Sequence, residues 1–188
     1  WEWPGNFCAE GTDLSKYSSK IPLIMNIPTR EECLRILASN STPENVIDHT
    51  KTVCKVAEEI AKRLEGEKIN RDLLVAGALL HDIEKVKPNH VMAGGKLNRE
   101  MGYPEVAQVI EKHSLYDIEN EEAQPHTFEE KIVFYADKRV KNTTIVTVKE
   151  RFDDIKKRYD LPHLEAEYKF TIKIEKELLG DNTEIKIE

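Results

Sequence analysis

The 188-residue sequence is short of the residues that mark several common protein classes. Its three cysteines, Cys8, Cys33 and Cys54, are too few and too irregularly spaced for a disulfide framework or a zinc knuckle. No apolar run approaches the roughly 20 residues that a membrane span needs. Positive charge is also in deficit, with 28 lysines and arginines against 35 acidic residues. A net charge of −7 argues against a surface for long nucleic acids, which must neutralise phosphates.

These shortages predict a protein of the reducing cytoplasm whose partners include neither a membrane nor a long nucleic acid. Hydrophobic residues make up 39% of the chain, and 188 residues are enough for one domain with a substantial core. Residues 1–24 mix tryptophan, proline, glycine and serine without helical periodicity. We expect them to be a cloning-derived or poorly packed extension, and residues 25–188 to form one domain.

Helical patterning is the feature that the sequence has most of. Thr29, Thr127 and Thr147 are each followed three residues later by glutamate, which is the capping-box pattern of a helix start. Apolar residues then recur at intervals of three and four. The expected helices cover residues 30–38, 44–65, 71–82, 104–113, 128–140, 148–159 and 162–178, with a further turn or helix after residue 88. No persuasive pair of strands is present, so we predict an all-α fold, a single-domain helical bundle of about seven or eight helices.

Potential metal ligands interrupt the apolar faces of three of these helices. His49, His113 and Asp137 share their helix faces with core-type valines, leucines and isoleucines. A fourth helix, apolar nearly all round, ends in the adjacent pair His81-Asp82. A single buried histidine is usually a hydrogen-bonded core residue. Buried imidazole and carboxylate groups on several helices are costly unless they are paired or bind a metal, and their number here favours a metal site.

The segments around these residues carry a family resemblance. Residues 78–85, ALLHDIEK, resemble the LLHDIGK segment of HDIG-type proteins, and residues 131–138, KIVFYADK, are similar to their KIVYYADK helix. With His49 upstream, the order His…His-Asp…Asp resembles that of the HD superfamily of metal-dependent phosphohydrolases. The similarity extends over about residues 26–160. Glu84 stands where the family usually has glycine, a departure that removes no ligand.

The resemblance implies a ligand set and a cofactor. Family members with four core ligands hold one metal, and members with two further histidines between the HD pair and the last aspartate hold two. The implied ligands are His49, His81, Asp82, His90, His113 and Asp137. In such a dinuclear site Asp82 would bridge both ions, and one ion would activate a water as nucleophile. Ligands of this kind suit iron, manganese, nickel, cobalt or zinc.

Two lysines are the candidate substrate contacts. Lys85, one helical turn past the HD pair, stands where the family has a phosphate-contacting lysine and is expected to act in catalysis and substrate binding. Lys138 also matches the family pattern and is the second candidate for substrate binding.

The expected function is hydrolysis of a small phosphate ester, with nucleotides as the first substrate class. Mononucleotides, dinucleoside polyphosphates, cyclic nucleotides and alarmones all carry phosphates that such a site can hydrolyse. Two alternatives have the same ligands: an HD-fold mixed-valence di-iron oxygenase, and a metal-stabilised sensing domain without turnover. The local match to HDIG-type members favours hydrolysis.

Overall fold

The computed structural model describes residues 26–114, 120–158 and 161–187. Within these ranges the chain forms eight α-helices, one short 3-10 helix and one pair of short strands. The helices are α1 (Arg30–Ser39), α2 (Glu44–Arg63), α3 (Arg71–Leu80), α4 (His90–Glu100), α5 (Pro104–Glu111), α6 (Phe128–Lys138), α7 (Val148–Arg158) and α8 (Leu164–Leu179). The all-α prediction is confirmed. The expectation for residues 1–24 lies outside the described residues, and the domain extent of 25–188 stays a prediction.

Side chains explain where several helices begin. In α1 and α6, the hydroxyls of Thr29 and Thr127 accept hydrogen bonds from backbone N–H groups three residues later, and glutamate carboxylates accept from the threonine N–H groups. Thr147 and Glu150 make the same reciprocal pair before α7. The Asn70 side chain accepts from a backbone N–H in the first turn of α3. These caps, which satisfy donors that a helix leaves free at its start, confirm the helix starts predicted from sequence.

Several boundaries differ from the prediction. α2, α3, α5 and α6 each end two residues before their predicted ends, and a turn follows α3 at residues 81–86. α8 begins two residues after its predicted start. The predicted absence of strands is wrong: β1 (Val140–Lys141) and β2 (Thr144–Ile145) form an antiparallel pair. Two residues per strand are too few for an alternating pattern, and the turn between them depends on Asn142 at a φ of 55°.

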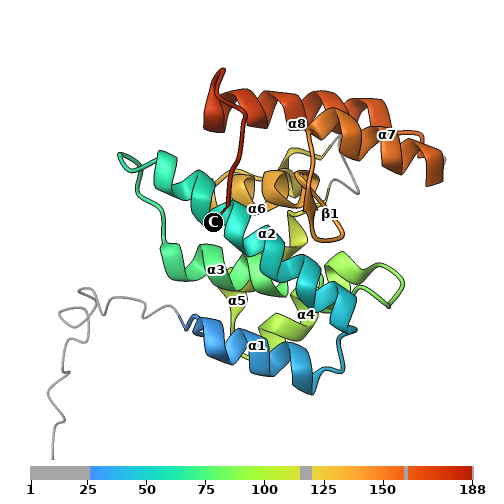
Figure 1. Cartoon of the computed structure of the whole chain (residues 1–188). Coiled ribbons are helices and arrows are strands. Elements are labelled where there is room, and N and C mark those ends of the chain that lie inside the picture. The colour runs from blue at the N-terminus through green and yellow to red at the C-terminus, as the bar shows by residue number, and fades with distance from the viewer. Residues whose placement is uncertain (1–25, 115–119, 159–160, 188) are drawn as a thin grey trace, which may run out of the picture.

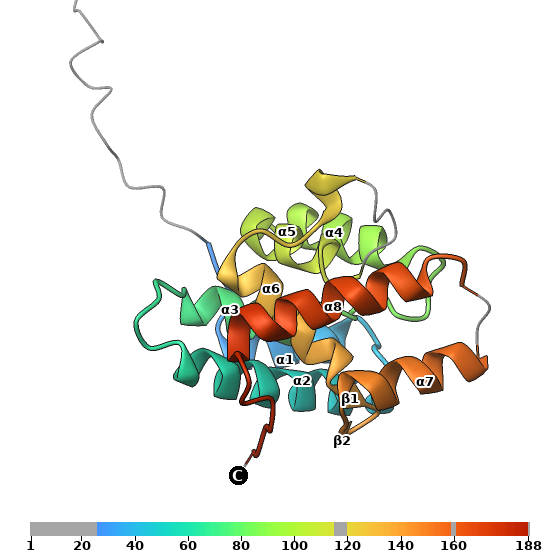
Figure 2. The ribbon, with the colours of Figure 1, turned by 90° about the horizontal axis from the view of Figure 1, so that it is seen from above.

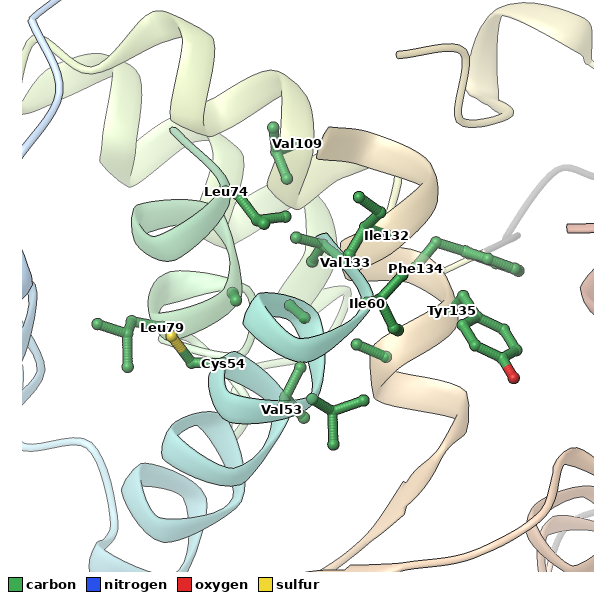
Figure 3. Close-up of a cluster of buried hydrophobic side chains, with 14 of the residues drawn as sticks. Val53, Cys54, Ile60, Leu74, Leu79, Val109, Ile132, Val133, Phe134 and Tyr135 are labelled. Atoms are coloured by element: carbon green, nitrogen blue, oxygen red, sulfur yellow. The ribbon is translucent and has the colours of Figure 1, made fainter. Parts of the chain in front are cut away.

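One hydrophobic core joins the central helices (Figure 3). Its buried side chains include Val53, Cys54 and Ile60 of α2, Leu74 and Leu79 of α3, Val109 of α5, and Ile132 and Val133 of α6. Removing these apolar surfaces from water is the main source of stability in such a bundle. The two described cysteines, on α1 and α2, are buried free thiols, which agrees with their positions in helical patterns.

α6 connects the two halves of the bundle. Figure 1 shows α1, α4 and α5 in the lower half of the view, α7 and α8 at the top, and α2 and α6 between them. In Figure 2, α8 crosses over α6 and α7 lies beside the strands. The last turn of α6 carries Asp137 and Lys138, and it lies where these halves meet. Within the described ranges, no helix is both long and apolar enough to cross a membrane.

Candidate metal centre

The structure brings the six predicted ligands together from separate elements. His49 lies on α2, His81 caps the end of α3, Asp82 follows it in the turn, His90 opens α4, His113 follows α5 and Asp137 lies in the last turn of α6. His49 and Asp137 contact each other although 88 residues separate them. The other two histidines, His126 and His163, are exposed and are not part of this cluster.

Asp82 lies at the centre of the cluster, and its two carboxylate oxygens face different histidine pairs. Oδ1 is 3.3 Å from His90 Nε2 and 3.5 Å from His113 Nε2. Oδ2 is 3.6 Å from His81 Nε2 and 4.0 Å from His49 Nε2. A carboxylate in this arrangement can bridge two cations, because each oxygen has its own set of imidazole nitrogens beside it.

Asp137 adds a second carboxylate beside two of these histidines. Its Oδ1 is 3.1 Å from His49 Nε2 and 3.7 Å from His81 Nε2. One ligand atom each from His49, His81 and Asp137 lie within 4.8 Å of one another, and the same is true of His81, Asp82 and His113. Nitrogen and oxygen ligands bind divalent ions at about 2.0–2.2 Å, so both groups of three are compact enough to surround an ion.

Backbone carbonyls orient three of the imidazole rings. His49 Nδ1 lies 2.8 Å from the carbonyl oxygen of Asn142, and the Nδ1 atoms of His81 and His113 lie 2.8 and 2.6 Å from carbonyls three residues earlier. A carbonyl only accepts hydrogen bonds, so each Nδ1 carries a proton, and in the neutral imidazole each Nε2 then presents its lone pair. Carbonyl partners that hold the second ring nitrogen are typical of metal-binding histidines.

These lone pairs face carboxylates rather than hydrogen-bond donors. In the neutral imidazole, a lone pair on His49 Nε2 lies 3.1 Å from a carboxylate oxygen of Asp137 and is repelled by it unless a proton or a metal ion lies between the two atoms. His81 Nε2 is fully buried, and no described residue donates a hydrogen bond to it. A buried polar atom without a partner is costly, and a metal ion supplies the missing partner. The donor set therefore fits divalent metal ions.

The charges of the cluster attract cations. Burial by itself would raise the pKa of Asp82, but the neighbouring imidazoles of His81, His113 and His90 hold that pKa well below its usual value. Burial has the same effect on Asp137, and there Lys138 and two histidines hold the pKa well below its usual value. Both carboxyl groups are therefore ionised at neutral pH, as metal ligands must be.

The pKa values of His81 and His113, which lie beside these carboxylates, are shifted in opposite directions. Burial tends to lower the pKa of His81, but Asp82 and Asp137 outweigh burial and raise it. Burial lowers the pKa of His113, even though Asp82 acts against it. The two carboxylates therefore favour a positive charge on His81, while burial disfavours one on His113.

Lys85 reaches the rim of the cluster from the turn after α3. Its Nζ is 3.1 Å from Asp82 Oδ2 and 3.4 Å from His90 Nε2, while 45% of its side chain remains exposed. An exposed ammonium group next to the central carboxylate is available to an incoming anion. Its predicted contact with a phosphate stays a prediction.

Lys138 is buried behind the cluster instead of lying on the surface. Its Nζ donates to the carbonyl of His113 at 3.1 Å and to Asp137 Oδ2 at 3.0 Å, and it lies 3.5 Å from a carboxylate oxygen of Glu167. Burial tends to lower its pKa, but the two carboxylates raise it, so Lys138 stays protonated. These contacts suit a lysine that orients Asp137, and its predicted role in substrate binding stays a prediction.

A cavity of about 320 Å³ opens over the ligands, and α7 forms one of its walls. Arg151, Ile155 and Arg158 of α7 line it, together with Leu161. The two arginines were not among the site residues predicted from the sequence, because arginines on a helix face are usually solvated. Their spacing of seven residues, with Ile155 between them, was the available signal. A second cavity of about 730 Å³ between α7 and α8 is lined by none of the six ligands.

Comparison with known proteins shows the family of this chain. The HD domain family matches residues 46–141, a range that includes all six candidate ligands and both lysines. An uncharacterised protein of Methanocaldococcus jannaschii is 33% identical over 146 residues, which is 69% of this chain and 83% of that protein. A dihydroneopterin 2′,3′-cyclic phosphate phosphodiesterase of the same organism is 51% identical over 43 residues, 21% of this chain and 17% of that protein.

One relative that is longer than this chain is named for methyl transfer and not for phosphate hydrolysis. A tRNA (cytidine(56)-2′-O)-methyltransferase of Picrophilus torridus is 34% identical over 167 residues, which is 77% of this chain and 48% of that protein. The chain thus spans about half the length of this relative. No solved structure matches the chain. The family match covers half of the chain, and the chain belongs to the HD domain family.

Proposed function

We propose that this protein is a metal-dependent phosphohydrolase that cleaves a small phosphate ester, with nucleotides as the first substrate class. The observation that carries the proposal is the position of Asp82, whose two oxygens face two different histidine pairs. HD domains bind divalent metals, five of the six candidate ligands fall in the two compact groups, and His90 Nε2 lies 3.3 Å from Asp82 Oδ1. Complete ligands also favour an enzyme over a sensing domain without turnover.

The protein side chains hold and orient the reacting groups. The residues that would hold divalent ions are His49, His81, Asp82, His90, His113 and Asp137, and bound ions would supply Lewis-acid stabilisation and an activated water. Lys85, beside Asp82 and exposed to the cavity, contacts a non-bridging phosphate oxygen as charge develops on it. Lys138 keeps Asp137 ionised and in place from behind. Residues of α7 and α8 form the wall of the cavity that faces these groups.

A cyclic phosphate diester is the first substrate to test. The phosphodiesterase relative is named for a 2′,3′-cyclic phosphate, although the match covers 21% of this chain. A ribonucleoside 2′,3′-cyclic phosphate has the same cyclic ester and belongs to the nucleotide class. The methyl transfer in the name of the Picrophilus torridus relative belongs to a protein about twice as long, so we do not extend it to this chain.

The test measures product release under strict anaerobiosis. The metal-stripped protein is reloaded separately with manganese, iron, cobalt, nickel or zinc and then given 2′,3′-cyclic, 3′,5′-cyclic and linear nucleotides. We expect hydrolysis with more than one metal. Asp82→Ala should abolish it and sharply lower metal content. Asp48→Ala, which removes a half-exposed carboxylate paired with Lys51 on α2, is the matched control and should change neither.

Each contrary result points to a specific alternative. Activity that depends on oxygen and iron, with the electron-spin signal of a mixed-valence pair, would establish the oxygenase. Full metal loading without turnover on any phosphate ester in the panel would favour the sensing domain. Near wild-type turnover by Asp82→Ala would show that the chemistry takes place elsewhere.

A further inference from the structure

The wall of the cavity opposite the metal ligands has a regular pattern of charge. Arg151, Ile155 and Arg158 are spaced four and three residues apart on α7, so their side chains share one face of that helix. All three line the cavity that opens over the ligands. Two arginines seven residues apart on a helix are about 10 Å apart along its axis. α7 therefore presents two guanidinium groups with an apolar side chain between them.

Asp154 contacts both arginines of this helix face and also Lys141, so its single negative charge is shared among three positive charges. Its carboxylate lies 2.8 Å from Lys141 Nζ and 3.9 Å from Arg151 Nη1, and it accepts a hydrogen bond from Arg158. One negative charge shared in this way does not fully compensate Arg151. Two other acids that line the cavity, Glu167 and Asp137, both contact Lys138.

Arg151 also has an unused hydrogen-bond donor. Its side chain is 16% exposed, and its Nε is buried without a hydrogen-bond partner among the described residues. Buried donors in folded proteins almost always have an acceptor. The planar guanidinium group, with its parallel N–H donors, matches the oxygens of a phosphate better than any neutral acceptor does.

We propose that Arg151, positioned by Asp154 and assisted by Arg158, forms a second anion subsite in the catalytic cavity. Resting on the proposed function, which puts the scissile phosphate at the metal ligands, this subsite selects substrates that carry a further phosphate group. The substrate class is a nucleotide with two separate phosphates. Ile155, Leu161 and Val46 give the cavity apolar surface for the part of the molecule between them.

The subsite is tested by binding, which does not require turnover. Adenosine 3′,5′-bisphosphate and adenosine 3′-monophosphate are titrated calorimetrically into the metal-loaded protein. The wild type should bind the bisphosphate about tenfold or more tightly than the monophosphate, the range expected for a charge-assisted hydrogen bond. Arg151→Gln should lose most of this preference with metal content unchanged. Arg151→Lys should keep part of it, because lysine retains the charge without the planar donors.

Lys149→Gln is the matched control, because it removes one positive charge from a lysine of α7 that is 75% exposed and paired with Asp153. It should leave the preference unchanged. If Arg151→Gln does not fold, Arg158→Gln should reduce the preference to a smaller extent. Equal wild-type affinity for the two nucleotides, or a preference that survives in Arg151→Gln, overturns the proposal.

The two proposals fail in different ways. Hydrolysis of phosphate esters without any preference for a second phosphate would overturn the subsite and leave the proposed function intact. An arginine-dependent preference in a protein that hydrolyses no phosphate ester would support the subsite and count against the proposed function.

Discussion

The protonation of single ring nitrogens decides what the buried cluster can bind. His49, His81 and His113 each use Nδ1 on a backbone carbonyl, which leaves Nε2 as an acceptor beside carboxylates that also only accept. If the protons were on Nε2, the same residues would form a hydrogen-bonded core with no need for metal. The carbonyls that accept from Nδ1 thus orient the Nε2 atoms of these histidines for metal binding.

At this scale, His113 separates a dinuclear site from a mononuclear one. His113→Ala removes an Nε2 that lies 3.5 Å from Asp82 Oδ1, on the side away from His49. Metal content should fall from near two equivalents toward one, since little but water can replace the lost ligand. Hydrolysis should fall by orders of magnitude, because Lewis-acid stabilisation is worth several kcal/mol. Elemental analysis and circular dichroism measure the metal and the fold.

Replacement of an exposed histidine, His126→Ala, provides the control and should keep both metal and activity. One equivalent of metal in wild type and His113→Ala alike, with activity unchanged, would show that His113 is an ordinary core histidine.

Among the helices, a close approach between α3 and α5 sets the position of the HD pair. Gly77 of α3 faces Val109 of α5, and a Cβ at Gly77 would lie 2.6 Å from Val109 Cγ1. Real Cβ atoms do not come so near, so the absence of a side chain at Gly77 allows the helices to pack. Since α3 leads directly into His81 and Asp82, this contact also positions the centre of the cluster.

Gly77→Ala should therefore destabilise the protein. Alanine favours an isolated helix by about 1 kcal/mol over glycine, but overpacking in a core typically costs about 1–3 kcal/mol. We expect a net loss in the free energy of unfolding, measured by urea denaturation. Val109→Ala removes the clashing methyl groups, so the double variant should lose less stability than the sum of the two single losses.

Gly66→Ala, where a Cβ meets nothing within 4 Å, is the control. An unchanged or higher stability for Gly77→Ala would contradict this account.

Over the whole molecule, the metal cluster and a second polar network join distant parts of the chain. Arg139, just after α6, donates to the hydroxyl of Tyr135, to the carbonyl of Val146 beyond the strands, and to that of Thr183 after α8. Tyr135 in turn donates to Glu175 of α8. This network attaches α8 and the strands to α6. The cluster does the same for α2, α3, α4 and α6, because its ligands come from all of them.

Metal binding should consequently stabilise the entire fold. A ligand at about 100 times its Kd adds about 2.7 kcal/mol, which corresponds to an increase in Tm of about 5–10 °C for a chain of this size. Differential scanning calorimetry of metal-free and metal-loaded protein measures the increase. It should shrink as the pH falls toward about 5, because imidazole must be deprotonated to bind metal.

The matched comparison uses the same two aspartate variants. Asp48→Ala should retain the increase in Tm, and Asp82→Ala should lose it. The same Tm with and without bound metal in the wild type would mean that the ions do not hold the helices together.

Local patterns predicted the helices and the ligand residues because both depend on short-range rules. A threonine and a glutamate three residues apart cap a helix wherever they stand, and apolar spacing shows which side chains turn inward. The same spacing placed His49, His113 and Asp137 on inward faces. Apolar spacing did not predict the strands after α6, because two residues per strand are too few to show a pattern. It also did not predict the end of α3, after which the chain enters the turn that carries Asp82.

The sequence by itself determined the all-α fold class and, through its resemblance to the HD superfamily, the choice of the six candidate ligands. The tertiary structure alone decided which oxygen of Asp82 faces which histidines, that Lys138 is buried, and that Arg151 lines the cavity. Those relations join residues far apart in the chain. They follow from how α6 and α7 pack against the rest of the bundle, and packing between distant segments leaves no periodic trace in the sequence.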